Sequence, residues 1–201
     1  KKCIVLDLDN TLWGGIIGED GIGGIQLSLS GQGASFIAFQ QAILDLYNRG
    51  VILAINSRNN FDEAINIIKS HPNMILKHDH FAAMRINWKD KALNIRELAQ
   101  ELNIGLDSMV FLDDNPFERN MVRTNVPEGI TVPELPEDPA EYMSFLRSLN
   151  LFETASYSEN DKKRTLQYQE QAKRVVTRKK FTNENEFLES MNMYSTIESF
   201  N

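Results

Sequence analysis

The sequence predicts an α/β fold, a parallel sheet with helices on both faces, followed by a helical C-terminal extension. Short apolar runs alternate with longer amphipathic patterns as far as about residue 133, which is typical of strand–helix–strand crossovers. Beyond that point the alternation stops and only helical patterns follow. We therefore expect a core of residues 1–135 and a helical extension, residues 136–201, that packs on it.

The candidate strands are short apolar runs, as expected for strands buried on both faces. They cover residues 3–8, 51–55, 74–76, 109–112 and 130–132. A glycine-rich stretch, residues 13–33, separates the first two runs. Because glycine favours turns, we expect this stretch to form a short hairpin flap.

The candidate helices have an apolar face and recognisable ends. Asn60 with Glu63 is a capping pair, Asp90 precedes another helix, and Pro116 lies in the first turn of a third. The expected helices cover residues 35–49, 61–70, 91–102, a segment opened by Pro116, 138–149, 158–177 and a last one from residue 183.

The composition excludes several classes of protein. The 201 residues suit one domain with a modest appendage, and 42% hydrophobic with 24% charged residues is ordinary for a globular chain. A net charge of −7 argues against electrostatic binding of nucleic acid or an anionic membrane, and no run is long enough for a membrane span. The single cysteine, Cys3, excludes an internal disulfide and fits a reducing, cytoplasmic location. With no initiator Met, the chain is expected to be part of a longer protein.

Polar residues gather at the ends of three predicted strands, where open parallel sheets bind ligands. They are Asp7, Asp9 and Thr11 at the first strand, Asn56, Ser57, Arg58 and Asn59 at the second, and Asp113 and Asp114 at the fourth, with Lys91 opening the helix before it. Such carboxylates would repel one another unless a hard divalent cation, most simply Mg²⁺, lay among them. Isolated Asp-Asn and Asp-Asp pairs also cap helices and form turns. Their recurrence on three strands favours a site for phosphoryl chemistry, with one Asp as nucleophile and another as general acid and base.

These residues resemble the four motifs of the haloacid dehalogenase (HAD) superfamily. The DxDxT motif, the Ser, the Lys and the acidic pair occur in the family's order, at Asp7, Asp9 and Thr11, then Ser57, Lys91, and Asp113 with Asp114. The resemblance implies a HAD-like parallel sheet. We expect no large cap domain over the site, because the 47 residues between Asp9 and Ser57 leave room only for a flap.

The resemblance also implies a role for each residue. Asp7 would form an aspartyl phosphate, and Asp9 would protonate the leaving oxygen and later activate water. Ser57 and Lys91 would hold the phosphoryl oxygens. Mg²⁺ would lie on Asp7, the backbone carbonyl of Asp9 and the acidic pair, with Asp114 preferred as a direct ligand. Substrate contacts are expected from neighbouring residues, namely Thr11, Trp13, Asn56, Arg58 and Asn59.

Longer runs narrow the resemblance. VLDLDNTLWGGIIGEDG, INWKDKALNIRELAQELNI and VFLDDNPFERNMVR resemble the FkbH-like branch, the glyceryl-loading proteins of polyketide biosynthesis. This implies an enzyme that takes a three-carbon acyl group from a small phosphorylated donor, 1,3-bisphosphoglycerate, and loads glyceryl or lactyl onto the phosphopantetheine thiol of an acyl carrier protein. The alternatives are a capless HAD phosphomonoesterase without acyl transfer, and a catalytically silent module that recruits a carrier.

One position departs from that branch. The family often has a cysteine before the motif-two serine, where this chain has Asn56. Cys3 lies at the opposite end of the first strand, so we expect direct attack by the carrier's thiol. Residues 162–180 carry a local charge of +7. This run is either a docking face for an acidic carrier or a solvated helix exterior.

Overall fold

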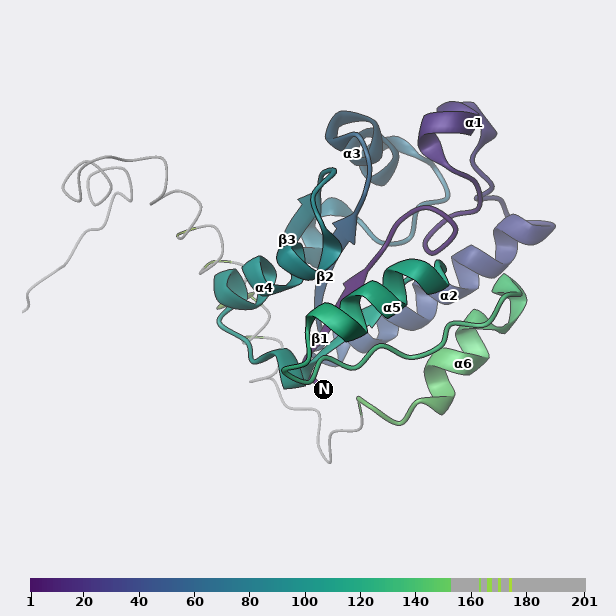
Figure 1. Ribbon diagram of the computed structural model, residues 1–201. Coiled ribbons are helices and arrows are strands. Elements are labelled where there is room, and N and C mark those ends of the chain that lie inside the picture. Colours follow the sequence, from purple (N-terminus) through teal and green to yellow (C-terminus); the bar gives the residue numbers. More distant parts are fainter. Residues whose placement is uncertain (153–162, 164–165, 168–169, 171–173, 175–201) are drawn as a thin grey trace, which may run out of the picture.

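A four-stranded parallel sheet forms the centre of the protein, in the order β3-β2-β1-β4 (Figure 1). The structure, a computed structural model, describes residues 1–152, 163, 166–167, 170 and 174. The strands are β1 (Cys3–Leu6), β2 (Ile52–Ser57), β3 (Phe81–Ile86) and β4 (Met109–Leu112). Central strand β1 pairs with β2 and β4 in parallel. The carboxyl ends of these strands therefore meet at one edge, as the sequence predicted.

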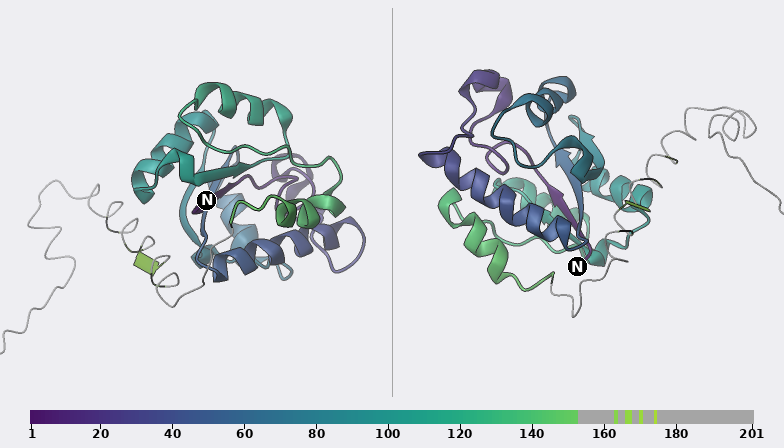
Figure 2. Two further views of the ribbon diagram at one scale, coloured as in Figure 1. Left: turned by 90° about the horizontal axis from the view of Figure 1, so that it is seen from below. Right: turned by 180° about the vertical axis from the view of Figure 1, so that it is seen from behind.

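Helices cover both faces of the sheet, as the two views in Figure 2 show. They are α1 (Ile17–Gly24), α2 (Gln32–Asn48), α3 (Phe61–Ser70), α4 (Lys91–Leu102), α5 (Pro116–Asn125) and α6 (Tyr142–Ser148), with single 3₁₀ turns at His78–His80, Leu106–Ser108 and Pro139–Glu141. Side chains alternate along β1, so Ile4 and Leu6 pack with α2 and α3, whereas Cys3 and Val5 pack with α4 and α5. The predicted α/β class is confirmed.

Two helices begin at the residues that their sequences predict, although Asn60 caps α3 through the Asp62 amide and not as a pair with Glu63. The Asn60 side chain accepts a hydrogen bond from the Asp62 amide at the start of α3. The Asp90 side chain accepts bonds from the Ala92 and Leu93 amides at the start of α4. These caps satisfy amides that a helix leaves unpaired.

The third predicted strand is wrong. Residues 74–76 form no strand, although Met74 and Leu76 are buried. The amides of Ile75 and Leu76 donate instead to the buried side chain of Gln40, at 2.9 and 3.1 Å. The third strand of the sheet is β3. Several of its residues are only partly buried and one is Arg85, so its sequence lacks the continuous apolar run expected of a buried strand.

The glycine-rich flap is also different from the prediction. Residues 17–24 are the helix α1, and the expected hairpin reduces to a bridge between Gly14 and Gln26. The Asp20 carboxylate accepts a hydrogen bond from the Ile16 amide at 2.8 Å, which favours a helix start. The fifth predicted strand reduces to a bridge between Val110 and Thr131.

Residues 136–152 pack on the core. Tyr142 of α6 is 2% exposed and contacts Phe36 and Phe39 of α2, with ring centroids 6.1 and 5.2 Å away. Its hydroxyl donates to the carbonyl of Asn10, in the loop after β1. The helices expected at 158–177 and from 183, and most of the basic run, lie outside the described residues.

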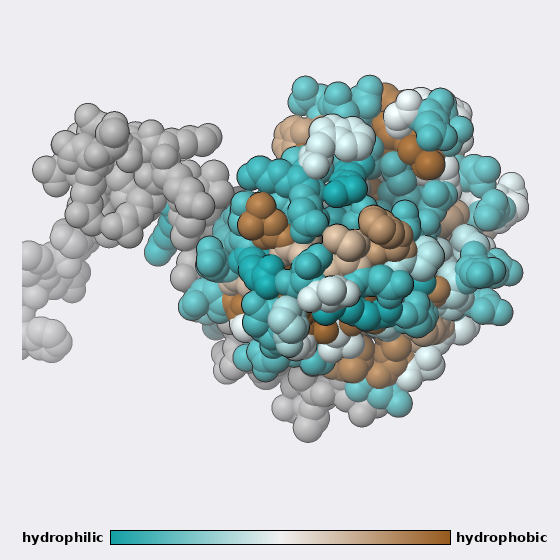
Figure 3. Space-filling view, in the orientation of Figure 1, coloured by the Kyte–Doolittle hydropathy of each residue, from teal (hydrophilic) through white to brown (hydrophobic). Residues whose placement is uncertain are grey.

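The visible surface is mainly polar, with apolar side chains in separate patches (Figure 3). Within residues 1–152 and the few described beyond them, no helix has the length and apolarity needed to cross a membrane.

Candidate active site

A cleft of about 170 Å³ opens at the carboxyl edge of the sheet. Its lining comes from the ends of the strands and the starts of the following helices: Asp7, Asp9, Asn10, Ile16, Ser57, Arg58, Lys91, Asp114, Asn115 and Glu118. The structure thus gathers six of the predicted site residues around one space. The remaining predicted residues lie behind that lining.

A buried lysine lies between two carboxylates. Lys91 is 4% exposed, and its Nζ lies 2.6 Å from Asp113 Oδ2 and 3.1 Å from Asp7 Oδ1. Burial alone would lower the pKa of Lys91, but the charges of Asp7 and Asp113 outweigh it and hold that pKa above its usual range. Lys91 therefore stays charged, yet one ammonium cannot balance both carboxylates and their neighbour Asp114.

The three carboxylates form a set that suits a divalent cation. Asp7, Asp113 and Asp114 each offer an oxygen within 4.8 Å of the others. Oδ1 of Asp7 is buried and accepts no hydrogen bond of good geometry, although Lys91 lies near it. Burial, followed by the charge of Asp7, raises the pKa of Asp113 to about 7 and that of Asp114 to about 6. Hard oxygen ligands with excess negative charge are the donors that Mg²⁺ prefers.

Asp9 faces the cleft separately from that cluster. Its Oδ1 accepts hydrogen bonds from Trp13 Nε1 at 2.9 Å and from the Ile17 amide at 3.4 Å, and its Oδ2 accepts one from Asn59 Nδ2 at 3.0 Å. Burial raises the pKa of Asp9, and the donors from Trp13 and Asn59 oppose that rise. A carboxyl with a raised pKa beside the proposed nucleophile Asp7 suits proton transfer. Metal binding through the Asp9 backbone carbonyl stays a prediction.

Four residues that the sequence assigned to substrate contact lie behind the lining of the cleft. Trp13 and Asn59 are buried and hold the Asp9 carboxylate, as described above. Thr11 is 0% exposed, and its Oγ1 accepts a hydrogen bond from the Asp114 amide at 3.2 Å. Asn56 is 0% exposed, and its Nδ2 donates to the carbonyl of Lys91 at 2.9 Å. In this structure these side chains position other residues, and of the five expected contacts Arg58 alone lines the cleft.

Glu118 and Arg119 lie one turn after the acidic pair, where the sequence predicts that they orient the acidic loop or pair with each other. Glu118, in the first turn of α5, forms an ion pair with Arg58 across the cleft, at 3.1 Å. Arg119 donates to the carbonyls of Asp113 and Asp114 at 2.8 and 2.7 Å, which holds the acidic loop in place.

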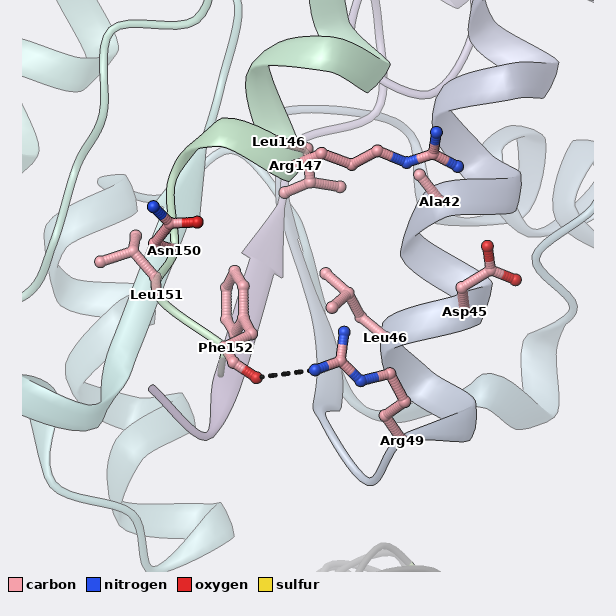
Figure 4. A pocket seen from close by; sticks show the side chains of 9 residues that line it. All are labelled: Ala42, Asp45, Leu46, Arg49, Leu146, Arg147, Asn150, Leu151 and Phe152. Carbon is pink, nitrogen blue, oxygen red and sulfur yellow. Dashed lines mark hydrogen bonds between the residues drawn. The ribbon is translucent and has the colours of Figure 1, made fainter. Parts of the chain in front are cut away.

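A second cavity, of about 280 Å³, lies between α2 and the end of α6 (Figure 4). Apolar side chains such as Leu46, Leu146 and Phe152 line it, and Arg49 donates to the carbonyl of Phe152 there. It contains none of the predicted site residues and one carboxylate, Asp45. The chemistry therefore belongs to the smaller cleft.

The raised carboxyl pKa values make the metal-free protein more stable in mild acid. The folded pKa values of Asp113 and Asp114 lie above the ordinary value of 3.8. Between the folded and unfolded pKa values the folded state binds more protons, so its stability rises as the pH falls through about 7 and 6. With the metal chelated, we expect a higher denaturant midpoint at about pH 5.5 than at about pH 8, and a larger stabilisation by Mg²⁺ at the higher pH. Asp113→Asn should reduce this pH dependence and the exposed Asp107→Asn should not, whereas a midpoint that rises with pH would contradict the assignment.

Comparison with solved structures supports the fold. The N-terminal part of the protein BF1531 from Bacteroides fragilis, which contains a phosphatase domain and is complexed with Mg, is 56% identical to this chain with a TM-score of 0.75. The similarity covers 78% of this chain and 42% of that one, so the chain spans less than half the length of this neighbour. A HAD family enzyme from Bacteroides thetaiotaomicron, in complex with magnesium and inorganic phosphate, is 13% identical with a TM-score of 0.45, over 68% of this chain and 94% of that one. No family model and no curated protein matches. The predicted α/β fold is confirmed, and the HAD superfamily with its FkbH-like branch stays a prediction.

Proposed function

We propose that this chain is a Mg²⁺-dependent phosphatase domain in which Asp7 is the nucleophile. The observation that carries the proposal is the convergence at one cleft of a three-carboxylate cluster, a buried lysine, a serine and a separate carboxyl with a raised pKa. The Mg-complexed phosphatase domain of BF1531, at 56% identity, supports the choice of cation and reaction class.

The residues present fit the cation. Asp7, Asp113 and Asp114 would hold Mg²⁺, which when bound supplies positive charge to the cluster and to the phosphoryl oxygens. Lys91 adds a fixed ammonium, and Ser57, 1% exposed at the end of β2, adds a hydroxyl. These donors suit the charge that spreads over the phosphoryl oxygens in the transition state.

The two aspartates of the first motif divide the chemistry. The Asp7 carboxylate attacks phosphorus while Asp9 donates a proton to the leaving oxygen, which leaves an aspartyl phosphate on Asp7. Asp9, now ionised, takes a proton from water as the water attacks phosphorus, and phosphate leaves. The hydrogen bonds from Trp13 and Asn59 favour the ionised form of Asp9 and so assist the proton donation of the first step.

At a finer level, we propose that the donor is a phosphorylated three-carbon acyl compound, 1,3-bisphosphoglycerate, and that the acceptor is the phosphopantetheine thiol of an acyl carrier protein. The resemblance of the long sequence runs supports this choice. Between β1 and α2 the chain forms the short helix α1, which is too small for a cap domain, so a substrate tethered to a protein has access to the cleft.

The chain's own thiol is unsuited to carrying the acyl group. Cys3 is 0% exposed, lies at the start of β1, and burial raises its pKa to about 12. The Cys3 side chain lies on the face of the sheet that α4 and α5 cover. We therefore propose that the carrier's thiol attacks the acyl carbon directly and expels the C1 phosphate, which leaves with the thiol proton. Asp7 then takes the phosphoryl group at C3, and its hydrolysis leaves a glyceryl thioester on the carrier.

Intact mass spectrometry separates acyl loading from the alternative, a capless phosphomonoesterase. We expect the carrier to gain the mass of a glyceryl group when it is incubated with 1,3-bisphosphoglycerate, Mg²⁺ and this protein. A carrier without its pantetheine arm should gain none, and a reaction without protein corrects for spontaneous acylation. Phosphate release with no gain in carrier mass would rule out loading and leave the phosphomonoesterase.

A further inference from the structure

Three asparagines connect the two groups that we expect to hold the phosphoryl oxygens. One end of their network is Ser57, whose backbone carbonyl accepts a hydrogen bond from the backbone N–H of Asn87 at 3.1 Å. The other end is Lys91, whose carbonyl accepts one from Asn56 Nδ2 at 2.9 Å. Between them, Asn94 Nδ2 donates to the side-chain oxygens of Asn56 and Asn87, at 3.0 Å each. The network therefore joins the end of β2, the residue after β3 and the first turn of α4.

Burial of these asparagines makes the loss of any of their hydrogen bonds costly. Asn56 and Asn94 are both 0% exposed. A buried amide that loses its partner has no water to replace it, so a shift of α4 would leave polar groups unpaired. Since Lys91 is the first residue of α4, the same hydrogen bonds determine where its ammonium lies relative to Ser57.

We propose that Asn56 is a positioning residue, which holds the first turn of α4 through Lys91 and Asn94 so that the Lys91 ammonium and the Ser57 hydroxyl keep their spacing in the cleft. Asn56 itself contacts no substrate, because none of the three asparagines lines the cleft. This inference rests on the proposed function, in which Lys91 and Ser57 bind the phosphoryl group.

Kinetics of Asn56→Ala test the proposal. At a temperature where circular dichroism shows the variant fully folded, we expect kcat to fall about 10- to 100-fold with KM little changed, because small displacements of catalytic groups cost that much. A residue that only stabilises the fold would lower the melting temperature and leave the kcat of the folded protein unchanged. Asn73→Ala is the matched control, since its side chain also donates to a backbone carbonyl, that of Leu27, away from the cleft.

A second background shows whether the effect passes through Lys91. In Lys91→Met, the added change Asn56→Ala should cost no further activity, since the group that it positions is gone. A further loss equal to that seen in the wild type would overturn the proposal. Asn94→Ala should lower kcat about as much as Asn56→Ala does. The double variant should have a kcat no lower than that of the less active single variant.

Thiol labelling tests the placement of residue 56 without any need for activity. In Asn56→Cys the new thiol should lie beneath the first turn of α4, and Cys3 is buried. An aromatic disulfide reagent should therefore label no thiol in the folded variant and two after denaturation. One rapidly labelled thiol in the folded variant would overturn the placement. If the wild type releases no phosphate at all, the proposed function fails, while this labelling result still reports on the network.

Discussion

Asp7→Asn is expected to abolish phosphate release, because an amide cannot form the aspartyl phosphate. The fall should reach at least about 1000-fold, since removal of a nucleophile elsewhere costs up to about a millionfold. Release of phosphate is measured with saturating Mg²⁺ and a simple phosphomonoester. The folded variant should nevertheless be more stable than the wild type when metal-free, because one of three mutually repelling carboxylates is gone.

The matched control is Asp45→Asn, which makes the same change at an exposed position on α2. It should leave phosphate release and stability unchanged. Turnover by Asp7→Asn above a hundredth of the wild-type rate would contradict the assignment of the nucleophile. An unfolded Asp7→Asn would also contradict the charge argument, which predicts the opposite sign.

Lys91→Met is expected to lower both activity and stability. The methionine keeps much of the side-chain length and removes the ammonium that lies between Asp7 and Asp113. Removing one partner of a buried ion pair leaves an uncompensated charge and costs about 3–5 kcal/mol of unfolding free energy. Loss of one fixed donor to the phosphoryl oxygens should also lower kcat about 100- to 1000-fold.

Mg²⁺ distinguishes the electrostatic effect of Lys91→Met from a packing defect. Because the cation supplies positive charge to the same carboxylates, Mg²⁺ should stabilise Lys91→Met more than the wild type in denaturant titrations. Lys89→Met is the control, since Lys89 is largely exposed and its pair with Glu97 is a surface pair of small energetic value. Equal denaturant midpoints for Lys91→Met and the wild type would refute a structural role for the Lys91 charge.

The parts of the fold that local sequence specifies were predictable. Helices α3 and α4 begin and end where their caps and apolar spacing placed them, because Asn60 and Asp90 satisfy the first amides of each helix. Strand β4 is a continuous apolar run buried on both faces. Elements that depend on distant partners were missed. Residues 74–76 have an apolar pattern, yet Gln40 from α2 takes the hydrogen bonds that a strand would need.

The same division applies to the cleft. The charged residues of the cleft could be predicted from the sequence, because carboxylates and a lysine that recur next to predicted strand ends indicate a binding site. Their supporting residues could not, because Thr11, Trp13, Asn56 and Asn59 look like further polar contacts until the structure shows which side chain each one touches.

The sequence by itself determined the α/β class, the order of the strand-end carboxylates and the absence of a usable thiol, since these follow from residue type, spacing and periodicity. Tertiary structure alone decided that Asp9 stands apart from the metal cluster, that Glu118 pairs with Arg58, and that Asn56 faces Lys91 instead of the cleft. The physical reason is that hydrogen bonds and ion pairs depend on distances of a few ångströms between residues far apart in the chain. Those distances exist only once the sheet and its helices have packed.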